Sequence, residues 1–247
     1  MPPPFEAAPL AATSQLALVV GGTTTGESDR IVRLLTPRGR LDAYAPGARR
    51  SKRRFSGALE PFQTIEAQLH RRGPGLVTMR SASVRRARLG LRSDLERITL
   101  ASYVAELGRL VAPEGEDTEM FAEVEACWDA LERVDVSAGL RRRFELRTLA
   151  VLGYRPAVGS CVVCGRSEGP AFLELSAGGR TCAAHHGGGP QLTASGWAWM
   201  GEALAEASRA ETTRPDPGPI GPALDRFLVE LLERRPKSLQ MVVDLGL

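Results

Sequence analysis

Glu60-Pro-Phe-Gln-Thr-Ile-Glu-Ala-Gln-Leu69 and Leu76-Val-Thr-Met-Arg-Ser-Ala-Ser-Val84 are the two stretches that decide the fold of the N-terminal part. Apolar and polar residues alternate along the first stretch, which is typical of a strand with one buried face. The alternation slips between Thr64 and Ile65, which indicates a β-bulge. A turn at Arg71-Arg-Gly-Pro-Gly75 separates the two stretches, so we expect two strands.

Two further strands are expected upstream, at residues 14–22 and at Leu41–Ala45. Short strands joined by glycine-rich turns over about 80 residues favour a small antiparallel barrel of the OB (oligonucleotide-binding) type. Barrels of this type bind single-stranded nucleic acid with a basic groove and stacking aromatic side chains.

The segment Gly21-Gly-Thr-Thr-Thr-Gly-Glu-Ser28 superficially resembles a nucleotide-binding P-loop. A P-loop needs a lysine that reaches the phosphates, and Glu27 stands at that position and would repel them. The pattern therefore excludes nucleotide hydrolysis at this segment. Beyond it, Ser28 or Asp29 can cap a short helix over Arg30–Thr36.

A dense basic segment, Gly47-Ala-Arg-Arg-Ser-Lys-Arg-Arg-Phe-Ser-Gly57, follows the second predicted strand. We call it the basic loop; it holds five cations between Arg49 and Arg54 and is closed by a glycine at each end, which favours a mobile loop. Cations at this density repel one another unless a polyanion or solvent takes up their field. The basic loop is therefore either a solvated surface or a phosphate-binding element.

The distribution of charge favours the phosphate-binding interpretation. Residues 1–91 contain 15 Lys/Arg and 6 Asp/Glu, a net charge of +9, whereas residues 92–247 contain 17 and 23, a net charge of −6. One part of the chain thus attracts a polyanion that the other repels. Nearly all cations are arginine, a bias to which we attach no functional meaning.

We expect any nucleic-acid contacts to come from this basic N-terminal part. Phe55, embedded among cations, is the candidate for stacking on a base, whereas Phe62 is expected in the core. The run Arg141–Arg143 is interpreted as a solvated helix face, with a DNA contact as the alternative. The candidate DNA-binding residues are Arg38, Arg40, Arg49, Arg50, Lys52, Arg53, Arg54, Phe55, Arg85, Arg86 and Arg88.

The remainder of the chain reads as helical. Apolar residues at helical spacing predict helices that start at a capping box at Ser93–Glu96, near Thr118, after Ser137, after Thr193 and near Pro222. Residues 239–245 are apolar and are expected to form an extended segment that docks on the body.

A cluster of cysteine and histidine interrupts the helical pattern. Cys161-Val-Val-Cys164-Gly is followed by Cys182-Ala-Ala-His185-His186, with a predicted ribbon strand and turn between the pairs. This spacing is typical of two knuckles that hold one tetrahedral Zn²⁺. His185 completes the spacing, with His186 as the alternative fourth ligand. A redox pair would use Cys161 and Cys164 but leaves the second pair unexplained.

Four protein ligands, Cys161, Cys164, Cys182 and His185, would close the zinc site and leave no position for an activated water. The metal is therefore expected to be structural. No motif of a hydrolase, a deaminase or a paired-carboxylate enzyme is present in the sequence. We expect a protein without catalytic activity.

The fold class that follows is α+β, an N-terminal OB-fold barrel followed by a helical domain with an inserted zinc site. The expected domains are a disordered leader (1–14), an OB-fold DNA-binding domain (15–88), a helical domain (89–158 and 190–247) and a zinc-binding insertion (159–189). No apolar run approaches the roughly 18 residues that cross a bilayer. We expect a cytoplasmic protein.

A set of short motifs is similar to the RecO family of bacterial DNA-repair recombination mediators. The motifs occur in the family's order over roughly residues 15–235, and together they are specific. They are Gly26-Glu-Ser-Asp29, Leu35-Thr36, Gly39-Arg-Leu41, Gly47-Ala-Arg-Arg-Ser-Lys52, Arg54-Phe-Ser-Gly57, Leu59–Phe62, Leu91-Arg-Ser-Asp-Leu95, Phe144-Glu-Leu-Arg147, Leu152-Gly-Tyr-Arg-Pro156 and Cys161-x-x-Cys-Gly165.

The resemblance implies an OB-fold, a helical domain and an inserted zinc site. It also implies binding of single- and double-stranded DNA, annealing of complementary strands, and assistance in loading RecA onto strands coated by single-strand-binding protein. RecR, through it RecF, and the acidic tail of the single-strand-binding protein would be partners. The chain departs from the family in His185, where a cysteine is common, and in its extra leader.

Three functions remain to be compared. The leading one is a non-catalytic DNA-binding mediator that uses the basic loop. The alternative is a zinc-containing protein-interaction scaffold in which the basic loop is incidental. A zinc-dependent nuclease or deaminase is disfavoured by the closed ligand set.

Overall fold

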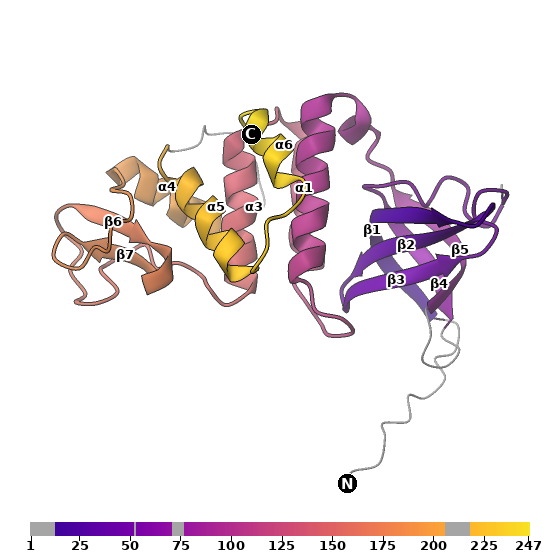
Figure 1. Cartoon of the computed structure of the whole chain (residues 1–247), viewed down its shortest axis with the longest axis horizontal. Coiled ribbons are helices and arrows are strands. Elements are labelled where there is room, and N and C mark those ends of the chain that lie inside the picture. Colours follow the sequence, from indigo (N-terminus) through magenta and orange to yellow (C-terminus); the bar gives the residue numbers. More distant parts are fainter. Residues whose placement is uncertain (1–12, 52, 71–76, 206–217) are drawn as a thin grey trace, which may run out of the picture. The chain divides into compact units, whose positions relative to one another are not determined.

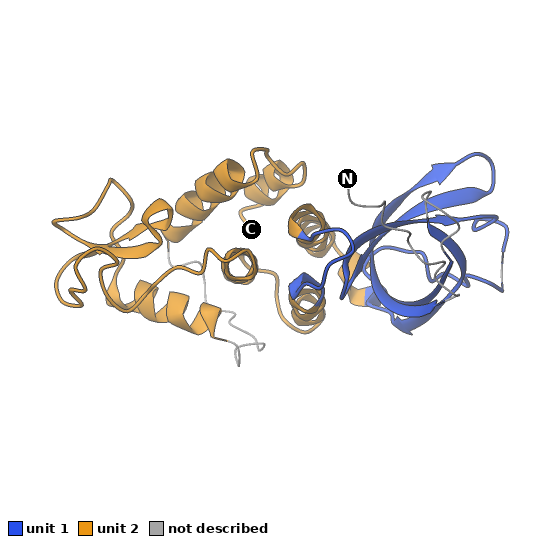
Figure 2. Ribbon diagram, turned by 90° about the horizontal axis from the view of Figure 1, so that it is seen from below, with its two compact units in different colours: residues 1–89, 112–121 blue, residues 90–111, 122–247 orange. Residues whose placement is uncertain are grey.

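The computed structural model describes residues 13–51, 53–70, 77–205 and 218–247. The chain forms two compact units, residues 1–89 with 112–121, and residues 90–111 with 122–247 (Figure 2). The first unit thus includes a segment, 112–121, that sequence reasoning placed in the helical domain. None of the helices in the described part of the chain has the length and apolar character needed to cross a membrane.

Five strands of the first unit close into an OB-like barrel (Figure 1). Their order around the barrel is β1-β2-β3-β5-β4, and β1 pairs with β4 to close it. Neighbouring strands are antiparallel except β3 and β5, which are parallel. The strands are β1 (Thr13–Thr25), β2 (Asp29–Thr36), β3 (Gly39–Ala45), β4 (Thr64–His70) and β5 (Val77–Arg86).

Strand β2 corrects the helix expected over Arg30–Thr36. Its residues pair with β1 on one side and with β3 on the other, from Asp29 to Thr36. Ile31 and Val32 are β-branched and suit a strand, but the partners that stabilise it are supplied by other parts of the chain. The expected bulge is confirmed, because the β4–β5 register shifts between Thr64 and Ile65.

The ends of β1 also differ from the sequence interpretation. β1 begins at Thr13, so the last two residues of the expected leader pair with β4, while residues 1–12 lie outside the described part. Gly21 and Gly22 lie inside β1 rather than in a phosphate-binding loop. The structure thereby supports the exclusion of a P-loop.

The barrel interior is filled by every second residue of its strands, as the period of a strand requires. Small and large side chains share this space, and residues from the connection between β3 and β4 complete it. The cluster comprises Ala17, Val19, Val32, Leu34, Ala43, Ala45, Phe55, Ala58, Leu59, Ile65, Ala67, Leu69, Val77, Met79 and Ala82.

Gly39 explains how the segment 112–121 attaches to the barrel. Arg40 N donates to the carbonyl of Pro113 (2.8 Å), and Thr118 N donates to the carbonyl of Pro37 (2.9 Å). A Cβ at Gly39 would lie 2.2 Å from the Pro113 oxygen, and the residue has φ +85°. Only glycine permits this approach in this conformation.

The second unit is built of helices (Figure 1). The predicted caps at Ser137 and Thr193 are confirmed. The cap of the first helix is Asp94 rather than Ser93, because the Asp94 carboxylate accepts from Arg97 N (2.8 Å). The helices are α1 (Leu95–Val111), α2 (Met120–Arg133), α3 (Ala138–Val151), α4 (Ala194–Leu204), α5 (Ile220–Leu231) and α6 (Leu239–Asp244).

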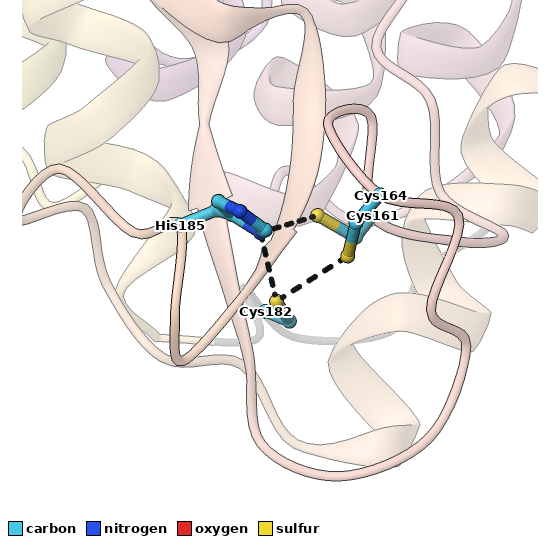
Figure 3. Close-up of side chains that lie close together, drawn as sticks. All are labelled: Cys161, Cys164, Cys182 and His185. Carbon is cyan, nitrogen blue, oxygen red and sulfur yellow. Dashed lines mark hydrogen bonds between the residues drawn. The ribbon is translucent and has the colours of Figure 1, made fainter.

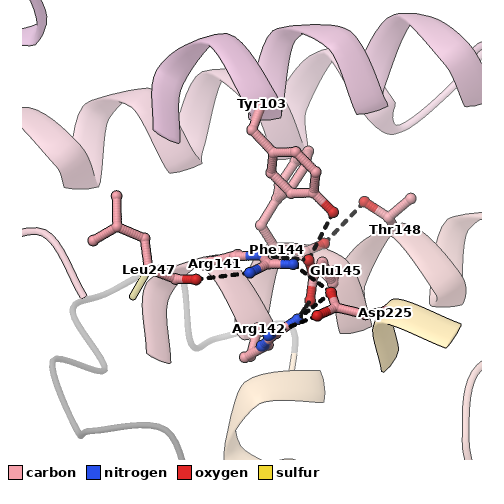
Figure 4. Close-up of polar contacts among 8 residues, drawn as sticks. All are labelled: Tyr103, Arg141, Arg142, Phe144, Glu145, Thr148, Asp225 and Leu247. Carbon is pink, nitrogen blue, oxygen red and sulfur yellow. Dashed lines mark hydrogen bonds and ion pairs between the residues drawn. The ribbon is translucent and has the colours of Figure 1, made fainter. Parts of the chain in front are cut away.

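Two features of this unit differ from expectation. The last apolar segment is helix α6, packed against α1, and not an extended strand. The run Arg141–Arg143 is buried in α3 and not solvated. Arg141 and Arg142 both pair with Glu145, and both reach Asp225 of α5 (Figure 4).

A two-stranded ribbon lies between α3 and α4 in the sequence, as predicted. It pairs β6 (Ala171–Glu174) with β7 (Gly179–Cys182) in antiparallel register. A short 3-10 turn, Leu175–Ala177, joins them. Of the cysteine and histidine cluster, Cys182 ends β7 and His185 follows it, whereas Cys161 and Cys164 precede β6.

Candidate nucleic-acid interface and metal centre

The basic loop lies in the connection between β3 and β4. The side chains of Arg49, Arg50, Arg53 and Arg54 are exposed. Lys52, the fifth cation of the prediction, lies outside the described residues. The loop thus presents four guanidinium groups to solvent from one short segment, which is the arrangement that phosphate contacts require.

Hydrogen bonds hold the start of the loop, although its glycines led us to expect mobility. Arg50 N (3.2 Å) and Ser51 N (3.0 Å) both donate to the carbonyl of Gly47. Arg54 Nη2 donates to the carbonyl of Pro46 (2.7 Å), and the Arg54 carbonyl accepts from Ala82 N of β5 (2.8 Å). The described part of the loop is therefore built onto the barrel.

The β1–β2 turn and the first residue of β2 make further contacts with the loop, among them a hydrogen bond from Arg49 N to the carbonyl of Ser28 (2.9 Å). The Asp29 carboxylate accepts from the Tyr44 hydroxyl and from Gly47 N (2.8 Å). The Tyr44 hydroxyl first, then Gly47 N and the Ser28 hydroxyl, lower the pKa of Asp29, and the same contact raises the pKa of Tyr44. Asp29 is thus held as a carboxylate beside the loop.

Phe55 is not available for stacking on a base, which corrects our expectation. Its side chain is 2% exposed and belongs to the barrel core. The Arg54 guanidinium lies 5.2 Å from the centre of its ring, within the range of a cation–π contact. Phe62 is buried as predicted.

The other candidate cations of the barrel lie at its two opposite ends. β5 runs parallel to β3, so Arg85 and Arg86, exposed at its end, lie toward the same end of the barrel as the basic loop. Arg85 pairs with Glu66, whose pKa is lowered by the Ser14 hydroxyl and by Arg85. Arg38 and Arg40 lie at the opposite end of the β2–β3 ladder.

Arg88 is a correction to the list of DNA-binding candidates. Its side chain is buried, and Nη1 donates to the carbonyl of Phe62 (3.1 Å) and to the Thr64 hydroxyl (2.9 Å). The guanidinium therefore satisfies buried acceptors of the barrel, and it is not presented to a ligand.

Sequence reasoning did not single out Arg33 and Arg80, which are exposed on the barrel strands β2 and β5. Arg33 was missed because its segment was read as a helix. An alternating pattern in β2, with Val32 and Leu34 inward, is the signal that places Arg33 on the outer surface.

The predicted metal ligands meet in the second unit (Figure 3). The sulfur atoms of Cys161, Cys164 and Cys182 and a ring nitrogen of His185 all lie within 4.8 Å of one another. Cys164 Sγ and Cys182 Sγ are 3.8 Å apart, and His185 Nδ1 is 3.3 Å from Cys182 Sγ. This cluster can hold a metal ion.

Two backbone knuckles bring the ligands together. Gly165 N donates to the Cys161 carbonyl (2.8 Å), and His185 N donates to the Cys182 carbonyl (2.9 Å). Gly165 has φ +73°, a conformation that suits glycine. The neighbouring His186 turns away and stacks on Phe172, with ring centres 4.3 Å apart, so the structure selects His185.

The surroundings of the cluster favour the thiolate form that a metal requires at Cys161 and Cys182 but not at Cys164. At Cys164 the backbone N–H of Arg166 lowers the pKa, but burial and the contacts with Cys161 and Cys182 outweigh it and raise the pKa. Burial raises the pKa of Cys161, but the backbone N–H groups of Cys164, Cys182 and Val163 outweigh it and lower the pKa to about 6. Burial acts on Cys182 in the same way, and its contact with His185 lowers the pKa. The contact with Cys182, followed by that with Cys161, raises the pKa of His185.

The fold and the two sites define a class of protein. It combines an OB-like barrel bearing a basic loop with a helical unit that contains a Cys₃His cluster able to hold a metal ion. In the part of the chain that the structure describes, these three cysteines and one histidine are the group of side chains that could hold a metal ion.

Comparison with known proteins places the chain within this class. The family model "Recombination protein O N terminal" matches residues 11–88, and the model "Recombination protein O C terminal" matches residues 92–240. The chain belongs to the RecO family of DNA repair proteins. The resemblance found in the sequence motifs is thereby confirmed.

Several relatives cover nearly the whole chain. DNA repair protein RecO of Anaeromyxobacter sp. (strain K) is 37% identical over 93% of this chain and 95% of its own length. The protein of the same name from Pelobacter propionicus is 37% identical over 92% and 94%, and that from Myxococcus xanthus is 33% identical over 94% and 97%. These names describe a role in DNA repair and no enzymatic activity.

Proposed function

We propose that this chain is a non-catalytic mediator of recombinational DNA repair that binds single- and double-stranded DNA through the basic loop. One observation supports this most: four arginines of one loop are exposed on an OB-like barrel. The barrel lies in the N-terminal part of the chain, which has the net positive charge. Arginine is suited to phosphate because its planar group donates two hydrogen bonds at once.

The same loop supplies a mechanism for annealing. Two complementary strands repel each other through their phosphates, and a cationic surface that binds both reduces this repulsion. Base pairing then supplies the free energy, so no nucleotide hydrolysis is needed. Binding would be tolerant of sequence, because phosphate contacts carry no sequence information.

We also propose that the protein acts on the bacterial nucleoid with the partners implied by its family. It would assist loading of RecA onto strands coated by single-strand-binding protein, together with RecR and indirectly with RecF. The acidic tail of the single-strand-binding protein would be a further partner. Membership of the RecO family supports these proposals.

The metal is proposed to be one Zn²⁺ with a structural role. With Zn–S bonds of about 2.3 Å, two thiolates of a tetrahedral site lie about 3.8 Å apart. The Cys164–Cys182 separation of 3.8 Å fits this geometry. Cys161, Cys164, Cys182 and His185 would hold the ion, which when bound cross-links the two knuckles.

The DNA proposal is tested by titrating fluorescent single-stranded and double-stranded oligonucleotides with the full chain. The variant replaces Arg49, Arg50, Lys52, Arg53 and Arg54 by serine. We expect it to lose most of its affinity for both ligands and to anneal complementary strands more slowly. Equal affinity and equal annealing in variant and wild type would refute the role of the loop.

A pull-down with purified RecR separates the mediator from the scaffold alternative. A mediator retains RecR binding and loses DNA binding when the loop is neutralised. Wild-type protein that captures RecR but does not bind DNA would favour the scaffold.

A further inference from the structure

Glu27 of the β1–β2 turn and Asp29, the first residue of β2, contact the basic loop in different ways. Glu27 and Asp29 are two positions apart and carry the same charge. Asp29 accepts hydrogen bonds that hold the start of the loop, whereas the Glu27 side chain pairs with one of the loop's arginines. The difference suggests opposite effects on DNA binding.

Asp29 stands at the start of a chain of hydrogen bonds. Its carboxylate accepts from the Tyr44 hydroxyl of β3, from the Ser28 hydroxyl (2.9 Å) and from Gly47 N (2.8 Å). The Gly47 carbonyl in turn accepts from Arg50 N and Ser51 N. Through these hydrogen bonds Asp29, which is fixed in the barrel, orients the backbone that carries Arg49 and Arg50.

The Asp29 carboxylate accepts from the Gly47 N–H, while the Gly47 carbonyl accepts from Arg50 N and Ser51 N, and Arg49 N donates to the carbonyl of Ser28 (2.9 Å). Gly47 adopts φ +65°, which a glycine reaches as readily as other conformations, so an external partner has to select it. A hydrogen bond to a charged acceptor is about twice as strong as one between neutral groups. The Asp29 carboxylate is suited to make that selection.

Glu27 acts on the loop through its charge. Its side chain is 91% exposed and lies 3.2 Å from the Arg50 guanidinium, which is itself 72% exposed. An exposed pair of this kind contributes little to stability, and a phosphate group can replace the carboxylate. The backbone carbonyl of Glu27 accepts from Arg49 Nη1 (3.2 Å), a contact that truncation of the side chain leaves in place.

We propose that Asp29 is a positioning residue for DNA binding, which fixes the start of the basic loop, and that the Glu27 carboxylate competes with phosphate for Arg50. This inference rests on the proposed DNA binding by the loop. The two substitutions are therefore expected to change DNA affinity in opposite directions, which net charge alone does not predict. Removing either carboxylate raises the net charge by one, and a simple charge effect would strengthen binding in both cases.

The test compares Glu27→Ala with Asp29→Ala in the full chain, titrating a fluorescent oligothymidylate at constant salt. Glu27→Ala should bind about two- to threefold more tightly, because a surface charge near the site is worth a fraction of a kcal/mol. Asp29→Ala should bind about tenfold more weakly, as expected when a charged hydrogen-bond acceptor that orders a loop is lost. Asp29→Asn should recover most of the loss, since its side-chain oxygen still accepts from Gly47 N.

Hydrogen exchange without DNA provides a second readout. The Gly47, Arg50 and Ser51 amides should exchange faster in Asp29→Ala than in wild type or Glu27→Ala, while the barrel amides and the melting temperature change little. Tighter or unchanged DNA binding by Asp29→Ala would overturn the proposal, as would unchanged exchange of these amides. If wild-type protein binds no DNA, the proposed function fails, and the exchange experiment still decides whether Asp29 positions the loop.

Discussion

Arginines in two short basic runs of this chain differ in solvent exposure, although the two runs look alike in the sequence. Arg49, Arg50, Arg53 and Arg54 are exposed on a loop, whereas Arg141 is fully buried in α3 and its neighbours nearly so. The difference comes from the partners. Glu145 lies one turn along α3, but Asp225 is far away in the sequence, so no local pattern revealed the buried network.

Glu145 is the centre of that network (Figure 4). Its carboxylate accepts from Arg141 Nε, Arg142 Nη1 (both 2.8 Å) and the Tyr103 hydroxyl (2.7 Å). Glu145→Ala leaves buried cations without this partner, and we expect a loss of about 3–5 kcal/mol in the free energy of unfolding. Urea unfolding followed by circular dichroism measures it, with the exposed Glu168→Ala as the control. A change within about 0.5 kcal/mol would contradict this account of the network.

The raised pKa of the buried Tyr103 hydroxyl leads us to expect that stability depends on pH. Burial, followed by the charge of Glu145, raises the pKa of Tyr103 well above its ordinary value. A phenol that binds its proton more tightly in the folded state contributes its full stability below the unfolded pKa of about 10, and this contribution is lost as the pH rises toward the folded pKa. We therefore expect the free energy of unfolding to fall above about pH 10.

The variant Tyr103→Phe should be less stable by roughly 1 kcal/mol at neutral pH, because Glu145 loses a donor. Its stability should fall less steeply between about pH 9.5 and about pH 11. Tyr154→Phe is the matched control, since the Tyr154 side chain is 51% exposed. Identical pH profiles in wild type and Tyr103→Phe would show that this phenol does not contribute.

At the scale of elements, the cysteine–histidine cluster beside the ribbon yields a prediction about two adjacent histidines. His185→Ala should lower the bound metal well below one equivalent and destabilise the ribbon, because the ion loses a ligand. His186→Ala should keep one equivalent, because this ring stacks on Phe172 and lies outside the cluster. Metal content of purified proteins by mass spectrometry decides between them. The reverse result would show that His186 is the ligand.

Cys161 and Cys164 provide the corresponding test on the other knuckle. Their joint replacement by serine should abolish stoichiometric metal and lower the melting temperature. A stable variant that retains one equivalent of zinc would contradict the proposed ligand set.

The elements that the sequence predicted well are those with local signals. The ribbon and the caps at Ser137 and Thr193 depend on a few neighbouring residues, and all were found. β2 was predicted wrongly because its strand character depends on pairing with β1 and β3. Residues 239–245 were predicted as extended, although most of them form α6, which packs against a helix distant in sequence.

The candidate site was predicted in the same uneven way. The metal ligands follow from spacing, because each knuckle is a local turn. The exposure of the loop arginines was also inferred from the sequence, since five neighbouring cations cannot all be buried. The burial of Phe55 and Arg88 was missed, because both fill space or satisfy acceptors that exist only in the folded barrel.

For the whole molecule, the uneven distribution of charge is the property that bears most directly on function. The N-terminal 91 residues carry +9 and the remainder −6. A polyanion is attracted to the basic part of such a chain and repelled by the acidic part. The acidic part thus stays accessible to other partners. The two family models divide the chain in a similar way, into an N-terminal part with the barrel and a C-terminal part with the helices and the cysteine–histidine cluster.

The salt dependence of single-stranded DNA binding tests most directly whether the basic loop itself contacts phosphates. Each phosphate contact contributes about 0.7 to the slope of log K against log salt concentration. Replacing Arg49, Arg50, Lys52, Arg53 and Arg54 by serine should reduce this slope by about 3, for four or five lost contacts. A control with the same change in charge replaces Arg166, Arg226, Arg234, Arg235 and Lys237, exposed cations of the second unit, and should keep nearly the wild-type slope. An unchanged slope in the loop variant, or an equal reduction in the control, would contradict the account.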